Sequence, residues 1–230
     1  MHAYCVVLPA FNEADHIGAV IKDVRKQPVD VVVIDDGSTD ETVAVSEAAG
    51  AVVIKHERNL GKGAALESGF DYAMLHLYEG LITMDADGQH DPEDIPCFID
   101  AFQRTGISVL IGNRMADVSA MPVIRRLTNH FMSWLLGRHM RQYIPDSQNG
   151  FRLYQADILP MVSSRSRGFA AESEVLLKLD ATGIRMDNVP VATLYGAERS
   201  KIRPLNDTAR FFKMLLKYLI RRGGSSSLRA

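Results

Sequence analysis

The chain has 230 residues, of which 47% are hydrophobic and 23% charged, so it is long enough for one domain with a full core. Its 26 lysines and arginines against 28 aspartates and glutamates give a formal charge of -2, which argues against a globally basic nucleic-acid binder. Cys5 and Cys97 form neither a disulfide framework nor a metal-binding pair, and they favour a reducing compartment. Without a signal peptide or a membrane-spanning run, we expect a cytoplasmic protein, with peripheral contact to the inner face of the membrane left open.

The first half of the chain alternates short apolar runs with helix-like stretches. Buried parallel strands are predicted where the runs lack polar alternation, over residues 4–8, 31–34, 51–54, 81–84 and 109–111. Helices are predicted between them, over residues 14–25, 40–49, 62–76 and 92–103. This order predicts an α/β fold with a mostly parallel, Rossmann-like sheet and helices on both faces.

The second half is less regular. It predicts helices over 122–139 and 169–182, a loop leading into a strand over 146–154, and a strand over 189–194. Asp207 is a plausible N-cap of a last helix. Since no linker is visible, we expect one domain over residues 1–205, followed by a basic amphipathic helix and tail over 206–230.

Acidic residues follow the fourth predicted strand, where ligands of parallel sheets bind. If the extended geometry persists, Asp85 and Asp87 point the same way, with the small Ala86 between them. Two such carboxylates suit Mg²⁺ or Mn²⁺ together with phosphate oxygens, as in a nucleotide diphosphate. The alternative is that both are turn residues and that Asp91 and Asp94 start the next helix.

Two further segments carry binding chemistry. Asp36 follows the second predicted strand and is suited to accept hydrogen bonds from a base or ribose, while Ser38 or Thr39 is expected to cap the next helix. Lys62 and its flanking glycines open a helix and form an anion site, with a plain glycine turn as the alternative.

Taken in order, four segments resemble the family 2 glycosyltransferases, most closely the polyprenyl-phosphate type such as dolichyl-phosphate mannose synthase. These segments are Pro9-Ala10-Phe11-Asn12-Glu13, Asp35-Asp36-Gly37-Ser38, Asn59-Leu60-Gly61-Lys62-Gly63 and Asp85-Ala86-Asp87-Gly88-Gln89. The resemblance continues through Gly112-Asn113-Arg114, Asn149-Gly150-Phe151-Arg152 and Arg199-Ser200-Lys201. This chain departs from the family in two places. It has Asn149 where the family often has the serine of Ser-Gly-Phe-Arg, and the spacing before Arg199 is compressed.

The resemblance implies a GT-A catalytic domain, a nucleotide-sugar donor and one divalent ion, Mg²⁺ or Mn²⁺. The donor-binding residues implied by position are Pro9, Ala10, Asn12, Glu13, Asp36, Lys62, Asp85, Ala86 and Asp87. The implied metal ligands are Asp85, Asp87 and Gln89. The resemblance also implies catalytic roles for Asp87, for Arg114, Arg125 and Arg126 at the acceptor phosphate (with Ser133 a weaker candidate), and for Arg199 and Lys201 at the donor diphosphate.

The acceptor decides which further groups the reaction needs. A lipid phosphate is already anionic and needs arginines, whereas a hydroxyl needs a general base, for which Glu172 and Glu174 are candidates. The alternative for the glutamates is that they complement the dipole in the first turn of a helix. The alternative for the arginines is that they lie on a solvated helix face. The last helix, with Arg210, Lys213, Lys217 and Arg221 along one face, suits either a membrane interface or ordinary packing.

The leading hypothesis is a metal-dependent, inverting transferase that moves a hexose from a GDP- or UDP-hexose to a polyprenyl phosphate. A second hypothesis keeps this donor and uses a saccharide or other hydroxyl acceptor, with Glu172 or Glu174 as base. A third is a nucleotide-binding module without catalysis. None of the three involves nucleic acid.

Overall fold

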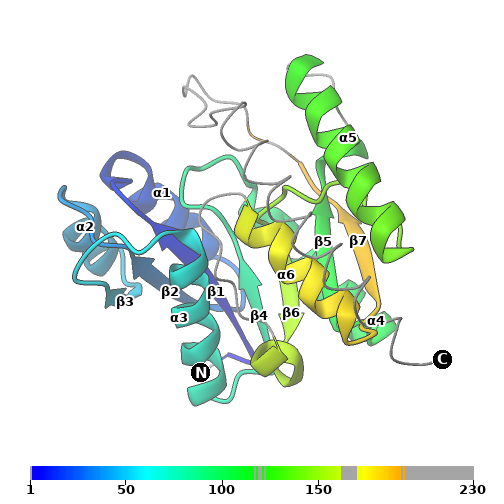
Figure 1. Cartoon of the computed structure of the whole chain (residues 1–230). Helices are drawn as coiled ribbons and strands as arrows, with labels where there is room; N and C mark the ends of the chain where they lie inside the picture. The colour runs from blue at the N-terminus through cyan, green and yellow to red at the C-terminus, as the bar shows by residue number, and fades with distance from the viewer. Residues whose placement is uncertain are drawn as a thin grey trace.

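The computed structural model describes residues 2–116, 118, 121, 123–161, 170–192 and 194. These residues form a seven-stranded sheet with helices on both faces (Figure 1). The strands are β1 (Tyr4–Ala10), β2 (Asp30–Asp35), β3 (Val52–Lys55), β4 (Gly80–Thr83), β5 (Val109–Asn113), β6 (Arg152–Gln155) and β7 (Met186–Pro190). The helices are α1 (Ala14–Val24), α2 (Thr42–Ala48), α3 (Lys62–Leu75), α4 (Ile95–Thr105), α5 (Val123–Met140) and α6 (Ala170–Ala181), with 3₁₀ turns η1 (Pro92–Asp94), η2 (Arg114–Ala116) and η3 (Ala156–Met161).

The strand order is β3-β2-β1-β4-β6-β5-β7. In the described sheet β6 runs antiparallel to both of its neighbours, β4 and β5, and the other pairings are parallel. The predicted α/β fold with a mostly parallel sheet is therefore confirmed.

Several local expectations need correction. β3 lies at the sheet edge and is partly exposed rather than buried, because it has a hydrogen-bonded neighbour on one side only. The strand expected over 189–194 lies earlier, at β7. The helix expected over 92–103 begins as η1, whose N-cap Asp91 accepts the Glu93 N–H at 2.9 Å.

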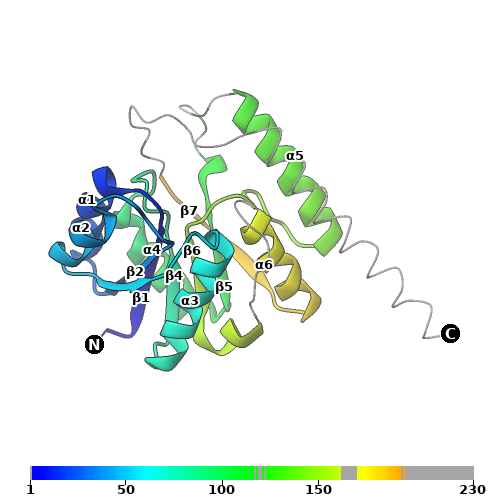
Figure 2. The same ribbon diagram turned by 60° about the vertical axis from the view of Figure 1, so that its left-hand side comes forward.

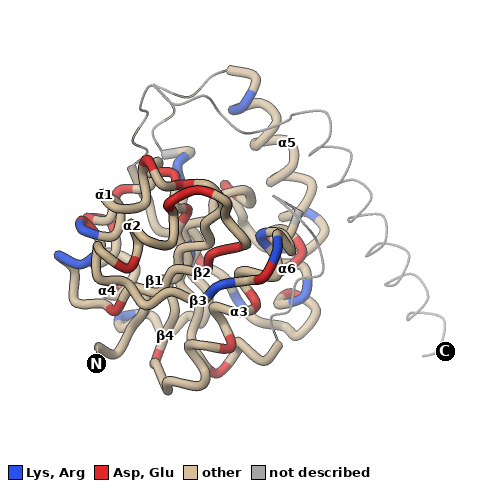
Figure 3. The backbone as a smooth tube through the Cα atoms, turned by 90° about the vertical axis from the view of Figure 1, so that its left-hand side faces the viewer, with Lys and Arg blue, Asp and Glu red and all other residues tan. Residues whose placement is uncertain are grey.

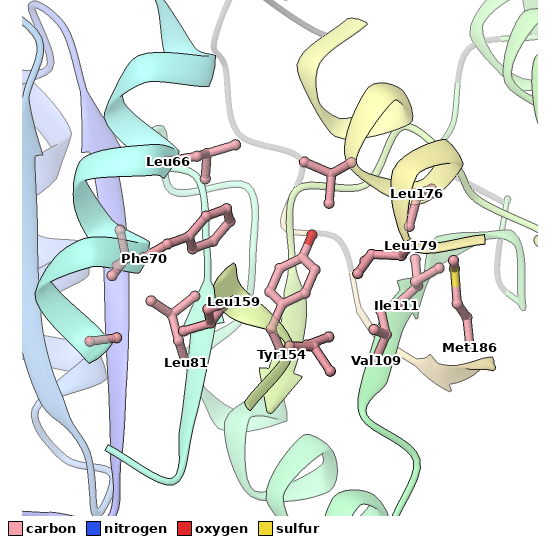
Figure 4. Packing of buried hydrophobic residues seen from close by; sticks show 14 of the residues in the cluster. Leu66, Phe70, Leu81, Val109, Ile111, Tyr154, Leu159, Leu176, Leu179 and Met186 are labelled. Carbon is pink, nitrogen blue, oxygen red and sulfur yellow. The ribbon is translucent and has the colours of Figure 1, made fainter. Parts of the chain in front are cut away.

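Two apolar clusters cover the two faces of the sheet. On one face, side chains of α3, α5 and α6 pack on the strands, and Figure 4 shows Phe70 of α3 beside Tyr154 of β6, with ring centroids 5.5 Å apart. On the other face, α1 and α4 contribute Ile17 and Phe98. Figure 2 shows α3 and α6 on the same face of the sheet. Strands buried on both faces explain the continuous apolar runs of β1 and β2.

This topology brings several chain segments to one edge of the sheet. The carboxyl ends of β1, β2, β4 and β5 lie there, and so does the start of β6, because β6 runs the opposite way. Among the helices of the described residues, none combines the length and hydropathy that crossing a bilayer requires.

Candidate active site

Hydrogen bonds join the segments that follow β1 and β2. Asn12 adopts a left-handed conformation (φ 54°), from which its N–H donates to Ser38 Oγ and its Oδ1 accepts the Thr39 N–H, both at 2.9 Å. The expected capping of α2 by Ser38 or Thr39 is therefore wrong. Instead, Asp40 Oδ1 accepts the Thr42 N–H at 3.0 Å at the start of α2. Ser38 is used to hold the two segments together.

Asp36 is buried and holds the loop that leads into α3. Its Oδ2 accepts the Gly61 N–H at 2.7 Å, and its Oδ1 accepts the Leu60 N–H at 2.9 Å and lies 2.8 Å from His56 Nδ1. Gly37, at φ +75°, lets this loop approach, since a Cβ there would lie 2.5 Å from the loop backbone. A direct contact of Asp36 with base or ribose stays a prediction.

The neighbouring Asp35 has an unsatisfied acceptor. Its Oδ2 accepts the Ser38 N–H at 3.2 Å, whereas its buried Oδ1 has no hydrogen-bond partner in the described part of the chain. Buried polar atoms are nearly always paired, so an unpaired one at a sheet edge points to a ligand donor. The sequence analysis singled out Asp36 and not Asp35. The position of an acidic residue after a strand does not tell which way its carboxylate points.

Lys62, Asp85 and Glu172 form a charge cluster at the centre of this edge. Lys62, the first residue of α3, places Nζ 2.5 Å from both Asp85 Oδ1 and Glu172 Oε1. Asp85 follows β4 and Glu172 lies in the first turn of α6. Three elements that are distant in the sequence thus deliver one ammonium and two carboxylates to one place.

The cluster fixes the ionisation of its members. Burial lowers the pKa of Lys62, but the charges of Asp85 and Glu172 outweigh burial and hold that pKa above its usual range. Burial raises the pKa of Asp85, but the Lys62 charge and the contact with His90 outweigh it and hold that pKa well below its usual range. Lys62 and Asp85 are therefore both ionised at neutral pH.

The carboxylates of Asp85 and Glu172 both lie next to Gly150, just before β6. A Cβ at Gly150 would lie 2.8 Å from Asp85 Oδ1 and 2.9 Å from Glu172 Oε1, so only glycine leaves room for both. Two buried atoms beside this point, Glu172 Oε2 and His90 Nδ1, have no hydrogen-bond partner among the described residues. An unpaired carboxylate oxygen next to an occupied one fits a ligand that brings a cation or a hydrogen-bond donor.

The acidic pair after β4 does not continue the strand. β4 ends at Thr83, and Ala86 and Asp87 lie in a turn where Asp87 Oδ1 accepts the Gln89 N–H at 3.0 Å. The expected extended geometry is therefore wrong, because Asp87 lies in a turn, and its role as a metal ligand stays a prediction. No three Asp, Glu, His or Cys side chains of the described residues form a metal-binding group. The oxygen donors present still suit Mg²⁺ or Mn²⁺ when further ligands come from a bound diphosphate.

Arg114, expected at the acceptor phosphate, lies in a buried ion pair. Its Nε donates to Asp146 Oδ2 at 2.7 Å and its Nη2 to Asp146 Oδ1 at 2.9 Å, and Asn129 of α5 donates to the same carboxylate at 2.7 Å. Burial raises the pKa of Asp146, but Arg114 outweighs it and holds that pKa below its usual range. Sequence reasoning missed Asp146 because it lies 32 residues from its partner. A role for Arg114 at a phosphate stays a prediction.

The other predicted acceptor residues lie on α5. Ser133 is buried and accepts the Ser147 N–H at 2.8 Å, so it joins α5 to the segment before β6. Arg125 is partly exposed and Arg126 exposed in the first turn of α5. The roles of Arg125 and Arg126 at an acceptor phosphate stay predictions.

Arg152, part of the Asn149–Arg152 segment of the resemblance but given no role there, holds the backbone next to the cluster. Its buried guanidinium donates to the carbonyl oxygens of Ser147, Asn149 and Glu172, at 2.7, 2.8 and 2.8 Å. Asn149, which stands where the family often has serine, donates to the Gly112 carbonyl at 2.8 Å. These bonds fix the backbone on both sides of Gly150.

Of the two glutamates considered as a base, Glu172 contacts Lys62, and Glu174 lies 3.7 Å from Lys178 on the same helix. Arg199 and Lys201 lie outside the described residues, as do the expected boundary at 205 and the basic helix after it.

Comparison with known proteins gives relatives along nearly the whole chain. An uncharacterized protein of Methanocaldococcus jannaschii is 33% identical over 94% of this chain and 91% of its own length. The UDP-N-acetylglucosamine–dolichyl-phosphate N-acetylglucosaminyltransferase of Methanococcus voltae is 28% identical over 87% of this chain and 89% of its own. Glucosyl-3-phosphoglycerate synthase of Mycobacterium tuberculosis, solved with Mn²⁺, UDP and glucosyl-3-phosphoglycerate, has a TM-score of 0.71 at 22% identity, covering 96% of this chain and 80% of that one.

These findings confirm the GT-A fold that the resemblance implied. The family model described as Glycosyl transferase family 2 matches residues 5–160, which hold the segments after β1, β2 and β4 and the start of β6. The chain therefore belongs to glycosyl transferase family 2 and is a glycosyltransferase.

Proposed function

We propose that this glycosyltransferase moves a hexose from a GDP- or UDP-hexose to a polyprenyl phosphate, with inversion at the anomeric carbon. The observation that carries the proposal is the convergence of Lys62, Asp85 and Glu172 at the ligand-binding edge of the sheet. The acceptor is supported by relatives named for dolichyl, dodecaprenyl, polyprenol and undecaprenyl phosphate chemistry.

The donor nucleotide occupies the joined segments after β1 and β2 in this proposal. Its pocket is lined by Pro9, Ala10, Asn12 and Glu13. Asp36 acts at the base or ribose, in part through the loop that it holds. We add Asp35, because its unpaired Oδ1 is the acceptor that a base N–H or a ribose hydroxyl needs.

The donor diphosphate lies over the segment after β4. Asp85, Asp87 and Gln89 would hold Mg²⁺ or Mn²⁺, with Ala86 leaving room, and the ion would supply positive charge at the leaving diphosphate. Lys62 lies beside Asp85 and adds a protein cation to this region. Arg199 and Lys201 are proposed to act on the same diphosphate.

The acceptor phosphate needs no general base. Its second pKa is near 6, so an oxygen is ionised at neutral pH and attacks the anomeric carbon directly. The new bond joins this oxygen to the anomeric carbon while the bond to the diphosphate breaks, and the nucleoside diphosphate leaves. Attack from the face opposite the leaving group inverts the configuration. Arg125 and Arg126 are proposed to hold the phosphate, and Arg114 contributes its partly neutralised charge.

A hydroxyl acceptor is the second candidate. The observation that favours it is the buried Oε2 of Glu172, which lacks a hydrogen-bond partner among the described residues and is free to accept a proton. Asp85 and Lys62 would then serve the donor as before. A nucleotide-binding module without catalysis does not fit membership in a transferase family.

The test is a transfer assay with the full chain, radiolabelled UDP- and GDP-hexoses, Mn²⁺ and a short polyprenyl phosphate in detergent. We expect label in the organic phase that mild acid releases. The matched control is the same polyprenol without its phosphate, which should take up no label. Equal labelling of both lipids, or no labelling with any donor, would contradict the proposal.

A further inference from the structure

Helix α5 exposes a row of large apolar side chains. Five of them are between 49% and 74% exposed: Val123, Ile124, Leu127, Phe131 and Trp134. The rings of Phe131 and Trp134 stack with centroids 6.2 Å apart, so the row is continuous at its C-terminal half. We call these five residues the α5 stripe. Exposed apolar rows of this kind mark interaction surfaces rather than ordinary protein surface.

The stripe lies on the side of α5 that faces away from the core. At 3.6 residues per turn, its five positions fall within an arc of roughly 100°. The residues that bury α5 against the domain lie on the other side: Asn129, Met132, Ser133, Leu136, Gly137 and Met140. The stripe therefore contributes nothing to the core clusters that hold the fold, and another explanation for its apolar character is needed.

The charged side chains of α5 itself are all basic. Residues 123–140 contain no aspartate or glutamate, although the whole chain has a net charge of -2. Arg126, His130 and Arg138 are exposed on this helix. Figure 3 shows α5 in tan and blue, standing at the side of the domain. An apolar row on a helix whose charges are all basic complements an anionic lipid surface. Pairing with a second copy of α5 would instead bring like charges together.

We propose that α5 lies in the interface of an anionic lipid bilayer, with the stripe in the acyl boundary and the arginines at the level of the lipid phosphates. The proposal rests on the proposed function for its purpose, since a polyprenyl acceptor resides in the bilayer. The opposite side of α5 supports it, because Asn129 contacts Asp146 and Ser133 contacts Ser147, next to the charge cluster. Docking through α5 brings the candidate active site to the lipid surface.

Trp134 provides a direct test because it is the chain's single tryptophan. Its fluorescence is recorded for the full chain with vesicles of phosphatidylcholine and phosphatidylglycerol in equal parts, and with phosphatidylcholine alone. We expect a blue shift and quenching by brominated lipid with the anionic vesicles, weakened by high salt. Unchanged emission with anionic vesicles would overturn the proposal.

Matched variants separate the stripe from general hydrophobicity. Leu127→Glu should lower vesicle binding about tenfold, because it places a charge in the apolar boundary. Leu75→Glu, at the 79%-exposed last residue of α3, is the control and should bind as the wild type does. Equal losses in both variants would overturn the proposal. So would a concentration-dependent dimer that Leu127→Glu dissociates while vesicles leave Trp134 unaffected.

The two proposals fail in different ways. Transfer to polyprenyl phosphate in detergent without vesicle binding would refute the docking surface and leave the proposed function standing. Vesicle binding through Trp134 without any lipid transfer would refute the proposed acceptor and leave the docking surface standing.

Discussion

Replacing Lys62 with methionine removes the cation from between two carboxylates while keeping a flexible apolar side chain. In the wild type, Lys62 Nζ lies 2.5 Å from Asp85 and from Glu172, whose side chain is 3% exposed. Removing one partner of a buried ion pair costs about 3–5 kcal/mol, because the remaining charge is uncompensated. Since Lys62 and Asp85 are 21% and 25% exposed, solvent screens part of this effect. We expect the free energy of unfolding to fall by about 3 kcal/mol.

The loss depends on pH in a defined direction. In the wild type the pKa of Asp85 is lowered by folding, so its contribution to stability is present above the unfolded pKa and is lost as the pH falls through the folded value. In Lys62→Met the two carboxylates repel each other, which raises the pKa of at least one of them above its unfolded value. The variant therefore gains relative to the wild type as the pH falls from about 7 toward about 5.

Thermal unfolding followed by circular dichroism in EDTA measures this effect. A loss of about 3 kcal/mol corresponds to a melting temperature lower by roughly 6–12 °C for a domain of this size. The control is Lys55→Met, which removes an exposed pair with Glu47 at 3.1 Å and should change the stability by less than about 1 kcal/mol. The reasoning would be refuted if Lys62→Met had the melting temperature of the wild type at neutral pH. It would also be refuted if Lys62→Met lowered the melting temperature no more than Lys55→Met does.

Three other variants test the site. Gly150→Ala places a Cβ 2.8 Å from Asp85 and should lower the free energy of unfolding in urea by about 1–3 kcal/mol, whereas an unchanged midpoint would mean that the carboxylates move aside freely. Asp146→Asn leaves Arg114 buried without its counter-charge and should lower the free energy of unfolding by about 3–5 kcal/mol. Adding Arg114→Met in the same chain should restore part of this stability, whereas strict additivity of the two losses would contradict the pairing. Glu172→Gln should lower turnover by about 10²–10⁴ at unchanged donor affinity if a hydroxyl is the acceptor, and far less if the acceptor is a phosphate.

The central strands were predictable because each is buried on both faces. The centres of β1, β2, β4 and β5 are uninterrupted apolar runs, so hydrophobicity alone locates these strands within two residues. β7 lies at the other edge of the sheet, and its exposed Asp187 and half-buried Asn188 interrupt the apolar pattern. The direction of β6 was not predictable, since the choice between parallel and antiparallel pairing depends on where the chain returns to the sheet and not on local residues.

The site was predicted as a set of segments but not as a set of contacts. Asp85 and Lys62 were placed at the right edge by the strand and helix that carry them. The bond between Lys62 and Glu172, however, joins positions 110 residues apart and depends on how α3 and α6 pack. Asp36 was read as a ligand residue because an acidic residue after a strand is common in nucleotide sites, while its hydrogen bonds to the loop before α3 have no local signal.

The central claim is that this edge of the sheet binds a nucleotide diphosphate together with a divalent ion. The most direct measurement is the thermal shift of the full chain with UDP, GDP and their hexose conjugates, in Mn²⁺ and in EDTA, for the wild type and for Asp87→Ala. We predict that at least one nucleotide raises the wild-type melting temperature in Mn²⁺ only, and that Asp87→Ala removes this rise. A rise of equal size in EDTA, or one that Asp87→Ala retains, would contradict the claim.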